Sequence, residues 1–220
     1  MICAVVLAAG RSRRMGTQKL LLDYGPKPLI THVVDQLLAS NIDRVFVVGG
    51  HDPDRIARAL LGRDVSFLVN ADYDTGMLSS MRCGVQALPD VCRAVLVTLG
   101  DQPAITPDIV NRLISAFHQT KKGIIVPLHN GRRGHPTLIA TRYRHAILAQ
   151  YDDVGLRGLL GEYSHDVFEL SVAELDIAAD IDTPEDYARQ LRLRDGHINA
   201  GPAATRLHAG KPQMMRRAEQ

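Results

Sequence analysis

Short, continuous aliphatic runs alternate with longer amphipathic segments along most of this chain. Five runs rich in Val, Ile and Leu have the length of β-strands: Ile2–Leu7, Arg44–Val48, Val65–Val69, Ala94–Leu99 and Ile124–Val126. Strands that are apolar on both sides are typical of a parallel sheet covered by helices on both faces. Two later runs, Pro136–Ala140 and Val167–Leu170, predict strands that extend or edge this sheet.

The segments between these runs carry helix signals. Thr31–Ser40 places its apolar residues at helical spacing. Asp52, Thr106 and Thr183 each stand directly before a proline, the order expected of an N-cap residue followed by the first helical residue. The alternation predicts a three-layer α/β/α sandwich with a Rossmann-like, mostly parallel sheet, in which ligands bind at the carboxyl ends of the strands.

Composition and charge limit the classes of protein to consider. The 220 residues, 45% of them apolar, suffice for one α/β domain with a tail. From Arg192 onward the chain carries six basic and two acidic side chains, a balance of +4, which leaves −2 for residues 1–191 because the whole chain is +2. A nearly neutral body argues against nucleic-acid binding. We therefore expect a catalytic domain over residues 1–191 and a basic, disordered tail over 192–220, irregular from about Asp195.

The sequence shows neither the pattern of a signal peptide nor that of a membrane-spanning segment. No apolar run approaches membrane-spanning length, and no basic segment precedes the first strand, so we expect a cytoplasmic protein without a signal peptide. Cys3, Cys83 and Cys92 are odd in number and lack metal-ligand spacing. They are interpreted as reduced, mostly buried thiols.

The stretch from Val5 to Leu22, VVLAAGRSRRMGTQKLLL, carries the clearest chemistry. A buried strand, a turn of small residues and a cationic loop together direct backbone N–H groups and guanidinium groups toward one point, which suits a polyphosphate. The loop is neither a Walker A motif, because Thr and Gln separate Gly16 from Lys19, nor a G-x-G-x-x-G dinucleotide motif. The alternative is that its arginines form a solvated turn.

A carboxylate follows another predicted strand. Asp101 comes directly after Ala94–Leu99 and Gly100, at the ligand-binding edge of the sheet. Mg²⁺ takes one or two protein carboxylates and completes its shell with water and substrate phosphates, so Asp101 is the first candidate ligand. Asp182 is the preferred second ligand, with Asp180 as the alternative on the same face of an extended segment. Asp101 could instead cap the helix that begins near Pro107.

Five motifs together resemble the molybdenum cofactor nucleotidylyltransferases, and within them the CTP:molybdopterin cytidylyltransferases. In chain order they are LAAGRSRRMGTQK (Leu7–Lys19), NADYDTGMLSSMRCG (Asn70–Gly84), GDQP (Gly100–Pro103), GRRGHP (Gly131–Pro136) and DIDTPEDY (Asp180–Tyr187). The first motif is shared with many nucleotidyltransferases, whereas the joint presence of the others is more specific. The resemblance covers roughly Met1 to Leu191 and implies the fold of the nucleotide-diphospho-sugar transferases.

The resemblance implies transfer of CMP from CTP to the terminal phosphate of molybdopterin or molybdenum cofactor, with release of pyrophosphate. The implied nucleotide-binding residues are Leu7, Ala8, Ala9, Gly10, Lys19, Asn70, Ser79 and Ser80. Members of the family that use GTP usually read Leu-Ala-Gly-Gly at the first turn, so Ala9 indicates a pyrimidine nucleotide. Ser79 and Ser80 could instead only cap a helix.

The remaining implied roles concern catalysis, metal and acceptor. Arg14, Lys19 and Asp101 are the implied catalytic residues, and Mg²⁺ on Asp101 and Asp182 is the implied cofactor. The acceptor is expected at Gly134, His135 and Pro136, although His135 could be only a turn residue before proline. The product is expected to reach an apo molybdoenzyme of the xanthine dehydrogenase type.

Two other functions stay open. One is the same chemistry with another substrate: a guanylyltransferase, or a cytidylyltransferase for a sugar or isoprenoid phosphate. The other is a nucleotide-binding carrier that holds the cofactor without turnover. The set formed by Lys19, Asp101 and Asp182 favours an enzyme, because a carrier needs no metal bridge.

Overall fold

A central sheet organises the molecule. The computed structural model describes residues 1–152, 154–172 and 180–199. Within them, eight strands form one sheet in the order β3-β2-β1-β4-β7-β5-β6, and β8 pairs with β5. The strands are β1 (Ile2–Ala8), β2 (Arg44–Gly49), β3 (Ser66–Val69), β4 (Ala94–Leu99), β5 (Ile124–His129), β6 (Arg132–Arg133), β7 (Thr137–Ala140) and β8 (Val167–Ser171).

Strand direction divides the sheet in two. β1 runs parallel to β2 and β4, β2 runs parallel to β3, and β8 runs parallel to β5. β7 is antiparallel to both β4 and β5, and β6 is antiparallel to β5. In the parallel half, Val5 stands opposite Phe46 on one side and Val97 on the other. The β1 and β4 ends that precede the phosphate loop and Asp101 are therefore neighbours at one edge.

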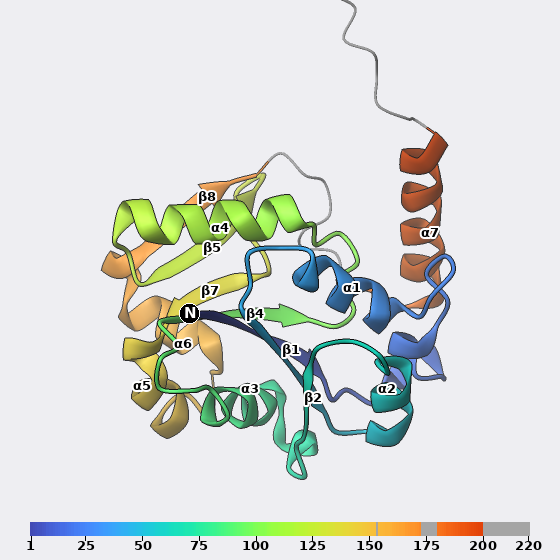
Figure 1. The fold of residues 1–220 in the computed structure, drawn as a ribbon, viewed down its shortest axis with the longest axis horizontal. Coiled ribbons are helices and arrows are strands. Elements are labelled where there is room, and N and C mark those ends of the chain that lie inside the picture. Colours follow the sequence, from blue (N-terminus) through green and yellow to red (C-terminus); the bar gives the residue numbers. More distant parts are fainter. Residues whose placement is uncertain (153, 173–179, 200–220) are drawn as a thin grey trace, which may run out of the picture.

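Helices cover both faces of the sheet, and Figure 1 shows α4 on one side and α3 with α5 on the other. The helices are α1 (Leu29–Leu38), α2 (Pro53–Ala59), α3 (Met77–Gln86), α4 (Pro107–Thr120), α5 (Arg144–Ala149), α6 (Leu156–Glu162) and α7 (Pro184–Asn199). One core lies between the sheet and α1, α2 and α4, and the other between the sheet and α3, α5 and α6. This arrangement confirms the predicted three-layer sandwich.

The two faces follow from the alternation of side chains along β1. Ala4 and Val6 belong to the first core, whereas Cys3 and Val5 belong to the second, and all four are fully buried. On the second face β1 and α3 lie very close together, since a Cβ at Gly84 of α3 would lie 2.5 Å from Cγ1 of Val5 in β1. Only glycine lets this helix lie so near the strand.

Two local expectations are wrong in detail. The run Pro136–Ala140 was expected to extend or edge the sheet, but β7 lies inside it, between β4 and β5, because the β5–β6 hairpin turns the chain back. Asp52 has a left-handed φ of 56° and makes no side-chain cap. Its carboxylate accepts a hydrogen bond from Arg55 Nη1 at 2.9 Å instead. By contrast, Thr106 accepts a hydrogen bond from the N–H of Ile109, as expected of a cap.

The last helix continues past the residue at which irregular structure was expected. α7 runs to Asn199, beyond Asp195, and the part of it before Asp195 rests on the body of the protein. Leu191 packs beside Tyr24, and the Arg194 guanidinium lies 5.2 Å from the centre of the Tyr24 ring. Residues 200–220, the rest of the expected tail, lie outside the described residues.

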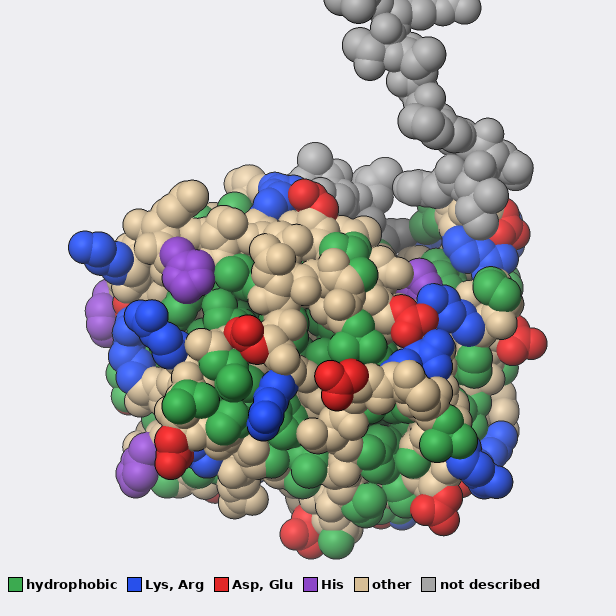
Figure 2. Space-filling view, in the orientation of Figure 1, with side chains coloured by type: hydrophobic (Ala, Val, Ile, Leu, Met, Phe, Trp, Pro, Cys, Tyr) green, Lys and Arg blue, Asp and Glu red, His purple; other side chains and the backbone are tan. Residues whose placement is uncertain are grey.

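The surface in Figure 2 carries both signs of charge. Lys and Arg side chains are interspersed with Asp and Glu over this face, without one continuous basic patch. Within the described part of the chain, no helix combines the length and the apolar character needed to cross a membrane. Cys3 and Cys92 are buried, Cys83 is half-buried, and all three are free thiols.

Candidate active site

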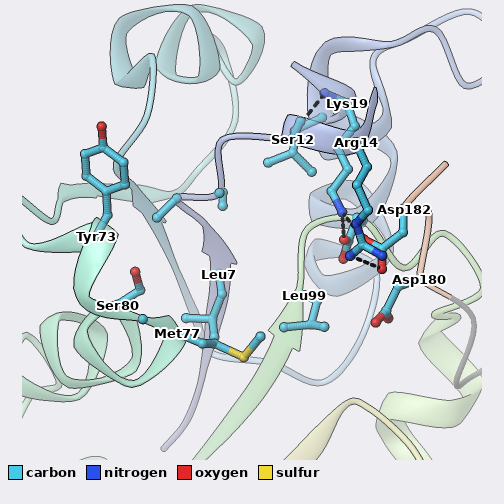
Figure 3. A pocket seen from close by; sticks show the side chains of 16 residues that line it. Leu7, Ser12, Arg14, Lys19, Tyr73, Met77, Ser80, Leu99, Asp180 and Asp182 are labelled. Carbon is cyan, nitrogen blue, oxygen red and sulfur yellow. Dashed lines mark hydrogen bonds and ion pairs between the residues drawn. The ribbon is translucent and has the colours of Figure 1, made fainter. Parts of the chain in front are cut away.

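The phosphate loop and Asp101 meet at one edge of the sheet. Leu7 on β1 pairs with Leu99 on β4, and the N–H of Gly100 donates to the carbonyl of Leu7 at 3.0 Å. A cavity of about 420 Å³ opens at this point, and Figure 3 shows the side chains that line it. Its lining includes the whole predicted turn Leu7-Ala8-Ala9-Gly10, together with Arg14, Lys19, Asp101, Asp180 and Asp182.

Lys19 lies at the centre of the charged end of this cavity. Its ammonium group contacts a carboxylate oxygen of Asp101 and lies 3.0 Å from Oδ1 of Asp182. Arg14 Nη2 reaches the other oxygen of Asp182 at 2.7 Å. The structure thus brings together Arg14, Lys19, Asp101 and Asp182 from three distant parts of the sequence.

Burial and charge act in opposite directions on these groups. Burial alone would lower the pKa of Lys19, but Asp101 and Asp182 outweigh this effect and the pKa is raised. Burial raises the pKa of the Asp101 carboxyl above its ordinary value, and the attraction of Lys19 only partly offsets it, while Asp180 adds repulsion. Asp101 therefore carries a charge that is costly until a further cation approaches.

Asp182, the preferred second metal ligand, differs from Asp180 in its hydrogen-bond and ion-pair partners. Asp182 shares the Lys19 cation with Asp101, whereas Asp180 accepts a hydrogen bond from Gln102 Nε2 at 2.6 Å. Asp186, and not Asp182, accepts from the N–H and hydroxyl of Thr183, so Asp182 is not used as a helix cap. One or two carboxylates are the protein ligands that Mg²⁺ bound to substrate phosphates usually takes, so Asp101 and Asp182 could hold such an ion.

Two residues that the sequence analysis did not single out hold Lys19 in place. The hydroxyl of Ser12 donates to Gln18 Oε1 at 2.9 Å and accepts from the N–H of Lys19 at 3.1 Å. Gln18 is buried, and its amide reaches the carbonyls of Gly10 and His51. Ser12 has a left-handed φ of 53°. This rare conformation could not be read from the sequence.

The predicted nucleotide-binding residues Asn70, Ser79 and Ser80 form an inner and an outer layer beside residues 70–76, which we call the base-wall loop. Asn70 Nδ2 donates to the hydroxyls of Ser79 at 2.8 Å and Ser80 at 3.0 Å. Ser80 lines the cavity, whereas Asn70 and Ser79 lie behind it. Ser79 also donates to the carbonyl of Asp72. Neither serine is the N-cap of α3, which is Gly76 and has no side-chain cap. Asn70 and Ser79 thus position the base-wall loop.

A second cavity of about 500 Å³ adjoins the first. Gly134 and His135 line it, together with Gln102, Arg133, Arg157 and several apolar side chains, while Pro136 is not part of its lining. Burial lowers the pKa of His135, and the carbonyl of Val97 only partly opposes this. Asp180 lines both cavities, so the predicted nucleotide and acceptor loops face neighbouring spaces.

Comparison with known proteins identifies the family. Residues 4–167 match the MobA-like NTP transferase domain. The chain belongs to this family. It is therefore a nucleotidyltransferase, in agreement with the loop and carboxylates described above.

Relatives of this MobA-like protein agree in fold and in sequence. It is 29% identical over 187 residues to the molybdenum cofactor cytidylyltransferase of Escherichia coli K12, covering 84% of this chain and 93% of the relative. A nucleotidyl transferase from Methanothermobacter is 27% identical with a TM-score of 0.76, over 91% of this chain and 99% of the other. Rv0371c from Mycobacterium tuberculosis is 28% identical with a TM-score of 0.75, over 87% and 97% of the two chains. A structure of that mycobacterial protein contains manganese.

The site of this MobA-like protein contains lining residues for which the sequence analysis predicted no role. Among the described residues, no group of three or more His, Cys, Asp and Glu side chains gathers as a metal site. A metal here would depend on two carboxylates and on the phosphates of a substrate. Tyr73 lines the first cavity and lies within the motif Asn70–Gly84, although no role was predicted for it. Arg157 of α6 lines the second cavity and belongs to no motif.

Proposed function

We propose that this protein transfers CMP from CTP to the terminal phosphate of molybdopterin or molybdenum cofactor and releases pyrophosphate. The observation that carries the proposal is the convergence of the Lys19 ammonium on Asp101 and Asp182 beside the phosphate loop. The E. coli relative supports the acceptor and the nucleotide, and Ala9 in the cavity wall supports a pyrimidine base.

The reaction needs no general base. An oxygen of the acceptor phosphate, already anionic at neutral pH, attacks the α-phosphorus of CTP. A new P–O bond forms, the bond between the α-phosphorus and the bridging oxygen breaks, and the electron pair leaves with pyrophosphate. Lys19 and Arg14 neutralise charge on the transferring and leaving phosphates, and the two cavities hold the reactants in line.

Magnesium is the proposed cofactor, and Asp101 and Asp182 are the residues that would hold it. When bound, it supplies a Lewis acid that neutralises phosphate charge. Lys19 now occupies the position between the two carboxylates, so its ammonium would turn toward the triphosphate. The raised pKa of Asp101 fits this assignment, because an additional cation would relieve the cost of its charge.

A nucleotide-by-acceptor assay tests the proposal. Pyrophosphate release is measured with CTP and GTP, each against molybdenum cofactor and against a sugar phosphate. We expect release only when CTP and molybdenum cofactor are present together. Release with GTP or with the sugar phosphate would favour the alternative transferases, and binding of CTP without any release would favour a carrier.

Arg157 is expected to bind the acceptor and not the nucleotide. Its guanidinium lines the second cavity and makes no hydrogen bond or ion pair with any other residue of the described ranges, so it is available to an anionic acceptor. Arg157→Gln should raise KM for the acceptor about tenfold, the size of one charged hydrogen bond, and leave KM for CTP unchanged. An equal rise in both KM values, measured by steady-state kinetics, would contradict this role.

A further inference from the structure

An ion pair joins the phosphate loop to the base-wall loop. Arg11 Nε donates to Asp74 Oδ1 at 2.7 Å, and Arg11 Nη2 contacts the other oxygen of the same carboxylate. The guanidinium carbon lies 5.4 Å from the centre of the Tyr73 ring. We call Arg11, Tyr73 and Asp74 the strap. Arg11 follows β1, whereas Tyr73 and Asp74 lie between β3 and α3.

The strap lies at the outer end of the nucleotide cavity. Tyr73 lines this cavity, and in Figure 3 it flanks the opening opposite Arg14 and Lys19. Arg11 and Asp74 line an outer hollow of about 420 Å³ that shares Tyr73, Arg14 and Lys19 with the cavity. Tyr73 therefore borders both spaces, and Arg11 and Asp74 border the outer one.

Each loop is braced internally, and the strap joins one loop to the other. On one side, the Ser12 hydroxyl joins Gln18 to Lys19. On the other, the hydroxyls of Thr75 and Ser79 both donate to the carbonyl of Asp72. Gly76, with a φ of 123°, connects the base-wall loop to α3. Because glycine has no Cβ, its backbone dihedral angles can change at little cost, and the loop can pivot at this residue.

The strap is charged and accessible. The hydrogen bond that Asp74 accepts from Arg11 lowers the pKa of the Asp74 carboxyl, so both side chains are ionised at neutral pH. The side chains of Arg11 and Asp74 are 39% and 50% exposed, and an ion pair so accessible to water opens easily. The strap is nevertheless formed in the structure, where it joins the two loops.

We propose that the strap controls nucleotide exchange: it must open to admit a nucleoside triphosphate, and it closes again behind the bound molecule. The proposal rests on the proposed function only in that the ligand is a nucleoside triphosphate. A barrier that must open for entry and again for exit slows both association and dissociation. If Arg11 were instead a simple phosphate ligand, its loss would slow association and speed dissociation.

Stopped-flow fluorescence with mant-CTP distinguishes these possibilities. Arg13→Gln is the matched control, because it removes the same charge from the same loop without breaking the strap. Relative to Arg13→Gln, we expect Arg11→Gln to raise both the association and the dissociation rate constants by about two- to fivefold, the range of an exposed ion pair. Association of Arg11→Gln equal to or slower than that of Arg13→Gln would overturn the proposal.

A charge exchange provides the second test. Asp74→Asn should also speed dissociation, and the double variant Arg11→Asp with Asp74→Arg should return it to the rate of the unmutated protein. A double variant that still releases mant-CTP at the rate of Arg11→Gln would contradict the strap. If the unmutated protein binds mant-GTP but not mant-CTP, the proposed base is wrong and the strap is tested with mant-GTP. Failure to bind either nucleotide would overturn both proposals.

Discussion

Lys19→Ala is expected to reduce turnover by about 10²–10³-fold, equivalent to about 2.7–4 kcal/mol of lost transition-state stabilisation. The Lys19 side chain is only 14% exposed, so little water screens its charge as it acts on the phosphates. Water that fills the vacated space must reorient as charge develops and cannot replace an oriented ammonium. Pyrophosphate release under saturating CTP and acceptor measures the effect.

Stability has to be separated from catalysis in this variant. Loss of Lys19 leaves the buried Asp101 beside Asp182 without their shared cation, which destabilises the folded state. Lys19→Met keeps most of the side-chain volume, and its unfolding in urea shows whether the fold persists. Lys27→Ala is the matched control, because Lys27 forms an ion pair with Asp35 outside the cavities. Turnover of Lys19→Met within a few fold of the Lys27→Ala rate would contradict the role given to Lys19.

The strands and layers of this fold were predictable because burial selects aliphatic residues regardless of their partners. All five first runs became strands, with ends shifted by a few residues. Strand order was not predictable in the second half of the sheet. β6 consists of Arg132 and Arg133, both exposed, and has no aliphatic signal. Yet its hairpin with β5 places β7 between β4 and β5.

The charged centre of the site was predictable because each group follows a strand or begins a helix. Lys19 and Asp182 were named from local motifs, and their meeting follows from the edge of the sheet that they share. Gln102 and Asp180 illustrate the limit. Their hydrogen bond joins residues 78 positions apart, and nothing in either motif specifies the other. Arg157 was missed because an exposed arginine on a short helix has no distinctive spacing.

Asp101→Asn is expected to abolish most turnover and yet leave the protein at least as stable. The amide keeps the shape of the carboxyl but removes the charge that, with Asp182, would hold the metal. We expect a loss of at least about 10²-fold in pyrophosphate release, the scale of one oriented electrostatic group. Asp182→Asn should behave similarly. Asp180→Asn should change the magnesium concentration for half-maximal activity less than Asp101→Asn or Asp182→Asn, because Asp180 pairs with Gln102 instead.

The stability expectation follows from the direction of the pKa shift. Burial raises the pKa of Asp101 in the folded protein above its value in the unfolded chain. Such a group stabilises the fold below its unfolded pKa, and this contribution is lost as the pH rises through the folded pKa. At neutral pH the ionised carboxylate therefore costs stability, and the neutral amide avoids that cost. Thermal unfolding without metal should give Asp101→Asn a Tm equal to or above that of the unmutated protein.

Magnesium reverses this order, because only the carboxylate gains from the cation. Added magnesium and CTP should raise the Tm of the unmutated protein and have little effect on that of Asp101→Asn. At subsaturating magnesium and CTP, activity of the unmutated protein should fall on acidification at a pH above that expected for an ordinary aspartate, as Asp101 of the metal-free protein takes up its proton. A variant with normal turnover, or with an undiminished magnesium-dependent rise in Tm, would show that Asp101 does not hold the metal.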